Sequence, residues 1–313
     1  METSDKVASQ LETVRDYVRW AVSRFTKGGV YYGHGTDNAF DEALQLVLHT
    51  LGIPLGSESI LLDAKLTAKE RSLVLTVIDT RVLEKIPVPY LTGEAWFCGL
   101  AFSVDERVLI PRSPIAELIE HGFEPWLAGR PVEGILDLCT GSGCIGIACA
   151  HYFEEAEVDL ADLSADALVV AQKNIDRYEL GHRIRTVESD VFQALSGKKY
   201  DLIVSNPPYV DAEDLAAMPK EYHHEPALAL ASGLDGLDIT RQILLDAEHH
   251  LNEGGLLVVE VGNSCLALEA AFPEVPFTWV EFERGGHGVF VFTREELFQY
   301  RAIIRGHINK PAP

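Results

Sequence analysis

The tetrapeptide Asn206-Pro207-Pro208-Tyr209, the NPPY motif, holds the residue types best suited to chemistry in this chain. It follows an apolar run, residues 200–205, which is typical of a buried parallel strand. The two prolines fix φ and lack N–H groups, so the nearby carbonyls are rigid and free to accept hydrogen bonds. Asn206 adds a side-chain acceptor, and Tyr209 adds a ring that can stack on a flat group. Asn-Pro alone would indicate a plain turn, but the whole motif is suited to holding a planar –NH2 group for methyl transfer.

A second reactive segment, residues 137–146, joins a predicted strand to a predicted helix. Its glycines, Gly141 and Gly143, let the backbone approach a ligand, and the helix start behind them suits a carboxylate or a phosphate. Asp162 ends the next strand, where a carboxylate can bind ribose hydroxyls, and Asp190 follows the third strand, where it can accept from an adenine amino group. Each acid alone would indicate a helix cap or a solvated loop residue. Together they favour S-adenosylmethionine, whereas a nicotinamide dehydrogenase would leave the NPPY motif unexplained.

The elements that must position these residues alternate between strand and helix from Gly134 onward. This alternation predicts a doubly wound α/β sheet, in which ligands bind beyond the carboxyl ends of the strands. The predicted strands cover residues 135–138, 158–162, 184–187, 202–205, 256–260, 279–282 and 288–292, and the predicted helices cover residues 145–151, 165–178 and 240–251.

The N-terminal part has a different pattern, with apolar residues at helical spacing. We predict a helical domain over residues 1–86, a β-hairpin linker over 87–110, and the catalytic domain over 111–313. Asp37 is expected to cap one of the helices, and residues 67–70 have the capping-box pattern. The helical domain could recognise a partner or could be a structural appendage.

Composition narrows the class of protein. The chain has 313 residues, of which 48 are acidic and 26 are basic, for a net charge of −22. Such a surface repels phosphate backbones and favours basic partners, so we expect no binding to duplex DNA. No stretch is apolar enough to span a bilayer, and the N-terminus lacks an apolar signal core. The five cysteines show no zinc-type pairing, which predicts a reduced, cytoplasmic protein.

Several polar residues outside these segments are further site candidates. Residues 223–225, His-His-Glu, could hold a metal, but adjacent histidines rarely point at one ion, so no metal site is expected. His249 and His250 suit the C-terminus of a helix, and residues 285–288 are typical of a turn. Glu260 ends an apolar strand, where it could face the site or cap the strand.

Residues 137–143 and 205–209 together resemble the protein-glutamine N5-methyltransferases, and the resemblance covers nearly the whole chain. It implies a Rossmann-like class I S-adenosylmethionine-dependent methyltransferase domain with a small N-terminal helical domain. That family modifies the Gly-Gly-Gln glutamine of release factors or a glutamine of a large-subunit ribosomal protein. Residues 111–119 and 222–228 look like the ribosomal branch, whose substrate is ribosomal protein L-three. The release-factor branch usually has an acid and a threonine where residues 113–115 stand.

The resemblance also implies roles for single residues. Asn206, Pro207 and Tyr209 are expected to be catalytic, and Pro208 joins them in binding the substrate amide. The residues expected at S-adenosylmethionine, which leaves as S-adenosylhomocysteine, are Asp137, Cys139, Thr140, Gly141, Ser142, Gly143, Asp162, Asp190, Val191 and Asn206.

Two residues depart from the family pattern. Cys139 stands where glycine is frequent, and Val191 stands where an aromatic ring can stack on adenine.

Other functions stay open at this point. An adenine-N6 or guanine-N2 methyltransferase would also hold a planar –NH2 group, but it would need a basic groove. A non-catalytic cofactor-sensing module would not need the NPPY motif. The expected partner is the ribosomal protein, free or within assembling ribosomes, and no membrane partner is expected.

Overall fold

The computed structural model describes residues 10–56 and 58–308, which form two compact units. The first unit contains the described residues up to Ala95 together with Pro219–His224. The second contains Trp96–Met218 and the described residues from Glu225 onward. The chain therefore leaves the second unit after Met218 and returns to it at Glu225. The roles predicted for residues 1–86, 87–110 and 111–313 stay predictions.

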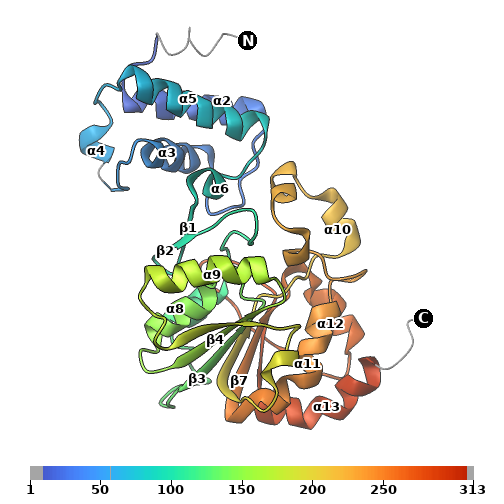
Figure 1. Cartoon of the computed structure of the whole chain (residues 1–313). Coiled ribbons are helices and arrows are strands. Elements are labelled where there is room, and N and C mark those ends of the chain that lie inside the picture. The colour runs from blue at the N-terminus through green and yellow to red at the C-terminus, as the bar shows by residue number, and fades with distance from the viewer. Residues whose placement is uncertain (1–9, 57, 309–313) are drawn as a thin grey trace. The chain divides into compact units, whose positions relative to one another are not determined.

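The first unit is helical, as Figure 1 shows in blue and cyan. Its helices are α2 (Val14–Gly28), α3 (Ala39–Thr50), α4 (Glu58–Leu61), α5 (Ala68–Leu83) and α6 (Val88–Thr92), and it also holds the 3-10 helix η2 (Lys220–His224).

Side-chain caps start these helices. The predicted capping box at α5 is confirmed, because Thr67 and Glu70 bond reciprocally to each other's backbone N–H. The prediction that Asp37 caps a helix was wrong. Asn38 caps α3 instead, because its backbone is extended and its Oδ1 accepts from Phe40 N and Asp41 N.

The second unit is built on a seven-stranded sheet with the order β5-β4-β3-β6-β7-β9-β8. The order reverses between β3 and β6, and β9 runs antiparallel to both of its neighbours. This arrangement confirms the predicted doubly wound α/β fold, whose ligand site lies at the point of reversal. The strands are β3 (Gly134–Leu138), β4 (Glu157–Asp162), β5 (Ile184–Glu188), β6 (Tyr200–Ser205), β7 (Leu251–Glu260), β8 (Thr278–Trp279) and β9 (Val289–Thr293).

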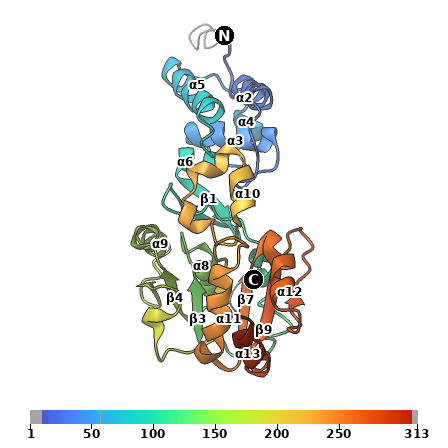
Figure 2. The ribbon, with the colours of Figure 1, turned by 90° about the vertical axis from the view of Figure 1, so that its right-hand side faces the viewer.

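Helices cover both faces of this sheet (Figures 1 and 2). Helices α7 (Ile115–Glu120), α8 (Cys144–Tyr152) and α9 (Ala165–Arg177) pack on one face. Helices α11 (Asp238–His250), α12 (Cys265–Ala271) and α13 (Arg294–Ile308) pack on the other. Successive residues of β3 enter opposite cores, Ile135 the first and Leu136 the second, because side chains alternate along a strand.

The remaining elements of the second unit are short. They are the hairpin β1 (Glu94–Phe97) and β2 (Leu100–Ser103), whose first two residues lie in the first unit, the helix α10 (Ala212–Ala217), and the 3-10 helices η1 (Gln193–Leu195), η3 (Ala227–Ala229) and η4 (Gly262–Ser264).

The sequence patterns missed some boundaries. Helices α6 and α13 were not predicted, and β7 begins at Leu251 rather than at residue 256. Its early part is irregular, with a register shift against β6 and Gly254 at φ +69°, so it lacks the apolar alternation of a regular strand. No helix in the described residues is long and apolar enough to cross a membrane.

We expect Asn174→Ala to lower the free energy of unfolding by about 2–4 kcal/mol. Asn174 on α9 is fully buried, and its amide bonds both the N–H and the carbonyl of Ser103 and the carbonyl of Ser142. Alanine would leave these three backbone groups buried without a partner. Urea unfolding of the full chain measures the loss. The exposed Gln172→Ala on the same helix is the control, and an equal loss in both variants would contradict the role of Asn174.

Candidate functional site

An open cavity of ≈ 1110 Å³, counted out to the solvent at its mouth, lies at the carboxyl ends of the central strands. The predicted site residues that line it are Cys139, Thr140, Gly141, Ser142, Asp162, Asp190, Val191, Asn206 and Pro208. The remaining four, Asp137, Gly143, Pro207 and Tyr209, do not line this cavity.

Asp137 lies beneath the glycine loop, residues 139–143, and holds it in shape. Its side chain is buried, and Oδ2 accepts hydrogen bonds from Thr140 Oγ1 at 2.5 Å and from Gly146 N at 2.9 Å. Burial raises the pKa of this carboxyl to about 7. Asp137 therefore ties β3 to the start of α8 and shapes the loop from below.

The glycine loop bends through left-handed backbone at three residues. Gly141 and Gly143 have φ of +54° and +82°, and Cys139 has φ +58°. Glycine adopts this region without a steric penalty, so Cys139 holds a backbone conformation that is strained for its residue type. Burial and the nearby Asp162 raise the pKa of the Cys139 thiol, so this thiol is a poor nucleophile.

Asp162 stands at the end of β4, on the wall of the cavity. Its two carboxylate oxygens accept from the N–H groups of Gly141 and Ser164, both at 2.9 Å. Burial raises its pKa above the ordinary value. Each oxygen keeps a second lone pair, so the carboxylate can still accept hydroxyl donors from a ligand.

The loop after β5 supplies Asp190 and Val191. Asp190 accepts from Gln193 Nε2 at 2.9 Å, and Val191 has φ +46°, a rare conformation for a β-branched residue. The Ser189 hydroxyl stabilises this turn by donating to Val191 O and accepting from Ala194 N. Strained backbone of this kind often accompanies a ligand site.

Asn206 presents an acceptor without a partner. Its Oδ1 is buried, and no hydrogen bond reaches it from any residue in the described part of the chain. The preceding residue, Ser205, donates from Oγ to Leu138 O at 2.8 Å and so ties the end of β6 to the end of β3. A buried acceptor left open in a cavity is costly unless a ligand donates to it.

Tyr209 is held beside the cavity by a second buried acid. Its hydroxyl donates to Glu260 Oε1 at 3.1 Å, and Ser113 Oγ donates to Glu260 Oε2 at 2.6 Å. Gly262 makes room for the tyrosine, because a Cβ there would lie 2.6 Å from the ring. The sequence patterns allowed Glu260 either to face the site or to cap a strand. In the structure it contacts Tyr209 of the NPPY motif and does not line the cavity.

Arg112, in the cavity wall, forms an ion pair with Glu225 that the sequence patterns missed. The guanidinium donates two hydrogen bonds of 2.6 Å to the two oxygens of Glu225, and Ile110 N donates to Oε1 at 3.0 Å. Arg112 lines the cavity.

The described residues contain no group of three or more possible metal ligands.

We expect Glu260→Gln to flatten the dependence of stability on pH. Burial raises the pKa of Glu260 from 4.5 to about 7, so the folded state binds its proton more tightly than the unfolded chain does. The contribution of the Glu260 proton to the free energy of unfolding is complete below about pH 4.5. It falls by on the order of 3 kcal/mol as pH rises through about 7. Asp137 acts in the same direction but is present in both proteins. Urea unfolding of both proteins at pH 5 and 8 measures the difference, and a gap independent of pH would contradict it.

Comparison with known proteins identifies relatives of this chain. A family model described as Methyltransferase small domain matches residues 125–222. The ribosomal protein uL3 glutamine methyltransferase of Francisella tularensis subsp. tularensis is 47% identical over 305 residues, which cover 97% of each chain. That of Neisseria meningitidis serogroup A is 54% identical over 294 residues, which cover 94% of this chain and 97% of the relative.

A solved ribosomal protein L11 methylase from Lactobacillus delbrueckii subsp. bulgaricus is more distant, with 21% identity, a TM-score of 0.41, and coverage of 61% of this chain and 85% of its own. That likeness adds nothing to the assignment, which depends on the two full-length relatives. By their identity and coverage, the chain belongs to the family of ribosomal protein uL3 glutamine methyltransferases.

Proposed function

We propose that this enzyme transfers a methyl group from S-adenosylmethionine to the side-chain amide nitrogen, N5, of a glutamine in ribosomal protein uL3. The observation that carries the proposal is the buried Asn206 Oδ1 in the cavity wall, which accepts no hydrogen bond from the described residues. A glutamine –NH2 group is a donor of matching geometry. The names of the two relatives support uL3 as the protein that supplies this glutamine.

The residues of the cavity fit S-adenosylmethionine. Asp162 would accept the ribose hydroxyls, and Asp190 with Val191 would flank the adenine. The glycine loop and the start of α8 would take the methionine carboxylate, because a helix N-terminus favours an anion. When bound, this cofactor supplies an electrophilic methyl group on a sulfonium.

The NPPY motif would activate the glutamine mainly through position. An amide nitrogen is a poor nucleophile because its lone pair is delocalised into the carbonyl. Asn206 Oδ1 and the Pro207 carbonyl would each accept one N–H bond, and both bonds strengthen as the nitrogen becomes cationic. Alignment of the reacting atoms contributes on the order of 7–11 kcal/mol. The nitrogen then loses one proton to water, so no general base is required.

Charge supports a basic protein substrate. The net charge of −22 attracts an rRNA-binding protein and repels RNA itself. The target glutamine would be accessible before uL3 is buried in the ribosome, so the substrate would be free uL3 or an assembly intermediate in the cytoplasm.

The substrate assignment is tested by parallel incubations with methyl-labelled S-adenosylmethionine. Undermethylated uL3, assembly particles, release factor and rRNA would each be offered, and the product would be mapped by mass spectrometry. Methylglutamine in uL3 is the expected outcome. Label on release factor would support glutamine methylation but with a different substrate. Label only on rRNA would overturn the proposal that the substrate is a protein.

Asn206→Ala should lower turnover by about 10²–10³-fold or more, since it removes an acceptor that is used most in the transition state. The cofactor dissociation constant, measured by calorimetry, should change far less. Asn252→Ala is the control, because Asn252 bonds Asp201 at the opposite, amino-terminal edge of the strands. Equal losses of turnover and cofactor affinity would count against the role of Asn206.

Asp162→Ala should weaken cofactor binding about 10–100-fold, because hydrogen bonds to a charged group contribute ~1.5–3 kcal/mol. Calorimetry with S-adenosylhomocysteine gives the dissociation constant. The control is Asp166→Ala, which removes an exposed carboxylate from the first turn of α9. An unchanged dissociation constant for Asp162→Ala would remove this residue from the cofactor site.

A further inference from the structure

The chain that follows the NPPY motif, residues 210–225, forms a strap with three fixed points. At its start, Val210 N donates to Leu230 O at 2.8 Å, and Val210 O accepts from Ser232 N at 3.0 Å. At its end, Glu225 pairs with Arg112 in the cavity wall. The third point is the segment Pro219–His224, which belongs to the helical first unit.

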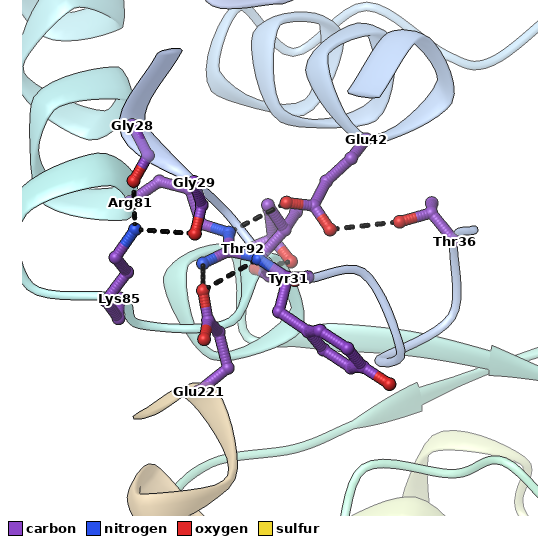
Figure 3. A network of polar contacts seen from close by, with 10 residues as sticks. Gly28, Gly29, Tyr31, Thr36, Glu42, Arg81, Lys85, Thr92 and Glu221 are labelled. Atoms are coloured by element: carbon purple, nitrogen blue, oxygen red, sulfur yellow. Dashed lines mark hydrogen bonds and ion pairs between the residues drawn. The ribbon is translucent and has the colours of Figure 1, made fainter. Parts of the chain in front are cut away.

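Arg81 of α5 holds this third point (Figure 3). Its side chain is 0% exposed, and Nη1 lies 3.2 Å from Glu221 Oε1 on the strap. Glu221 Oε1 also accepts from Tyr31 N at 3.0 Å, while Arg81 Nη2 donates to Tyr31 O at 2.8 Å. Arg81, Glu221 and one backbone residue therefore form a closed ring of hydrogen bonds.

A second carboxylate shares the same guanidinium. Glu42 of α3 accepts from Arg81 Nε at 2.7 Å and from Thr36 Oγ1 at 3.0 Å, and it is 2% exposed. Burial would raise the pKa of Glu221, but the Tyr31 N–H and the Arg81 charge lower it below the ordinary value. Both partners of the strap contact therefore stay charged at neutral pH, and either charge would be costly to leave buried alone.

The neighbours of Glu221 add weaker contacts to the same unit. The Tyr222 ring lies 4.5 Å from the His34 ring and 5.8 Å from the Tyr31 ring, between centroids. His224 Nε2 lies 2.9 Å from Glu84 O. Gly33 permits this fit, because a Cβ there would lie 2.7 Å from the Tyr222 hydroxyl oxygen.

The stretch between the fixed points is different. Helix α10 buries none of its residues, and its first turn carries the exposed acids Glu213 and Asp214. Asp211 caps this helix, because its side chain accepts from the N–H groups of Glu213 and Asp214. So small and exposed a helix depends on the anchoring of its ends for a fixed position.

We infer that Arg81 is a positioning residue for the methylation reaction, because it anchors the strap that continues from the NPPY motif. The inference depends on the proposed function for its kinetic part. With the anchor in place, residues 211–218 are tethered at both ends and have fewer conformations to lose when the protein substrate binds. Without the Arg81–Glu221 contact, residues 211–218 must become ordered when the substrate binds, and this loss of conformational entropy weakens binding. The KM for uL3 then rises, while kcat and cofactor affinity stay unchanged.

The test compares Glu221→Ala with Glu42→Ala in the full chain. Both variants remove a buried carboxylate from the same guanidinium, but only Glu221 lies on the strap. We expect Glu221→Ala to raise the KM for uL3 about tenfold, with the dissociation constant of S-adenosylhomocysteine within about twofold of wild type. Trypsin should cut after the exposed Lys220 about tenfold faster in this variant. Glu42→Ala should lower thermal stability but keep both the KM and the protection of Lys220.

Three further outcomes are decisive. Equal effects of the two alanine variants on KM and on cleavage would overturn the inference, because Arg81 would then only stabilise the helical unit. If Glu221→Ala does not fold, Glu221→Gln, which keeps an acceptor oxygen but loses the charge, should show the same changes at smaller size, and its failure to do so would also overturn the inference. If the wild-type enzyme leaves uL3 unmethylated, the proposed function fails, and the cleavage rates still decide whether Arg81 anchors the strap.

Discussion

The neighbouring carboxyl ends of β3 and β6 are the feature on which the rest of this enzyme depends. Leu138 and Ser205 are register partners, and the Ser205 hydroxyl donates to Leu138 O at 2.8 Å. Because the strand order reverses here, the loops that follow the two strands diverge and leave a cavity between them. The glycine loop and Asn206 thus meet at one place although more than sixty residues of chain separate them.

Two buried acids give these loops their shape. Asp137 binds the glycine loop from below, and Glu260 holds the hydroxyls of Tyr209 and Ser113. Burial raises the pKa of each carboxyl to about 7, a cost in stability at neutral pH that the fold tolerates at its site. In the proposed reaction they act as supports, and the groups that contact ligands are Asp162, the loop backbone and Asn206.

The second unit is not made of one continuous piece of chain. The NPPY motif is followed directly by the strap, and Pro219–His224 of the strap belongs to the helical unit through Arg81. The segment that would hold the glutamine and the segment fixed by the helical unit are thus parts of one stretch of about twenty residues. This covalent continuity offers a physical route by which a helical domain can influence catalysis without supplying a catalytic residue.

The sequence by itself determined the alternating α/β order, the strand that ends at the NPPY motif, the glycine loop and the acids at the strand ends. Each of these is a local pattern of polarity, glycine or proline, and local patterns are set by neighbouring residues. Only the tertiary structure decided that Asp137 and Tyr209 lie outside the cavity, that Glu225 pairs with Arg112, and that Arg81 binds Glu221. The Arg81 and Glu221 partners are 140 residues apart, and a buried charge carries no signal of its partner until folding brings the two together.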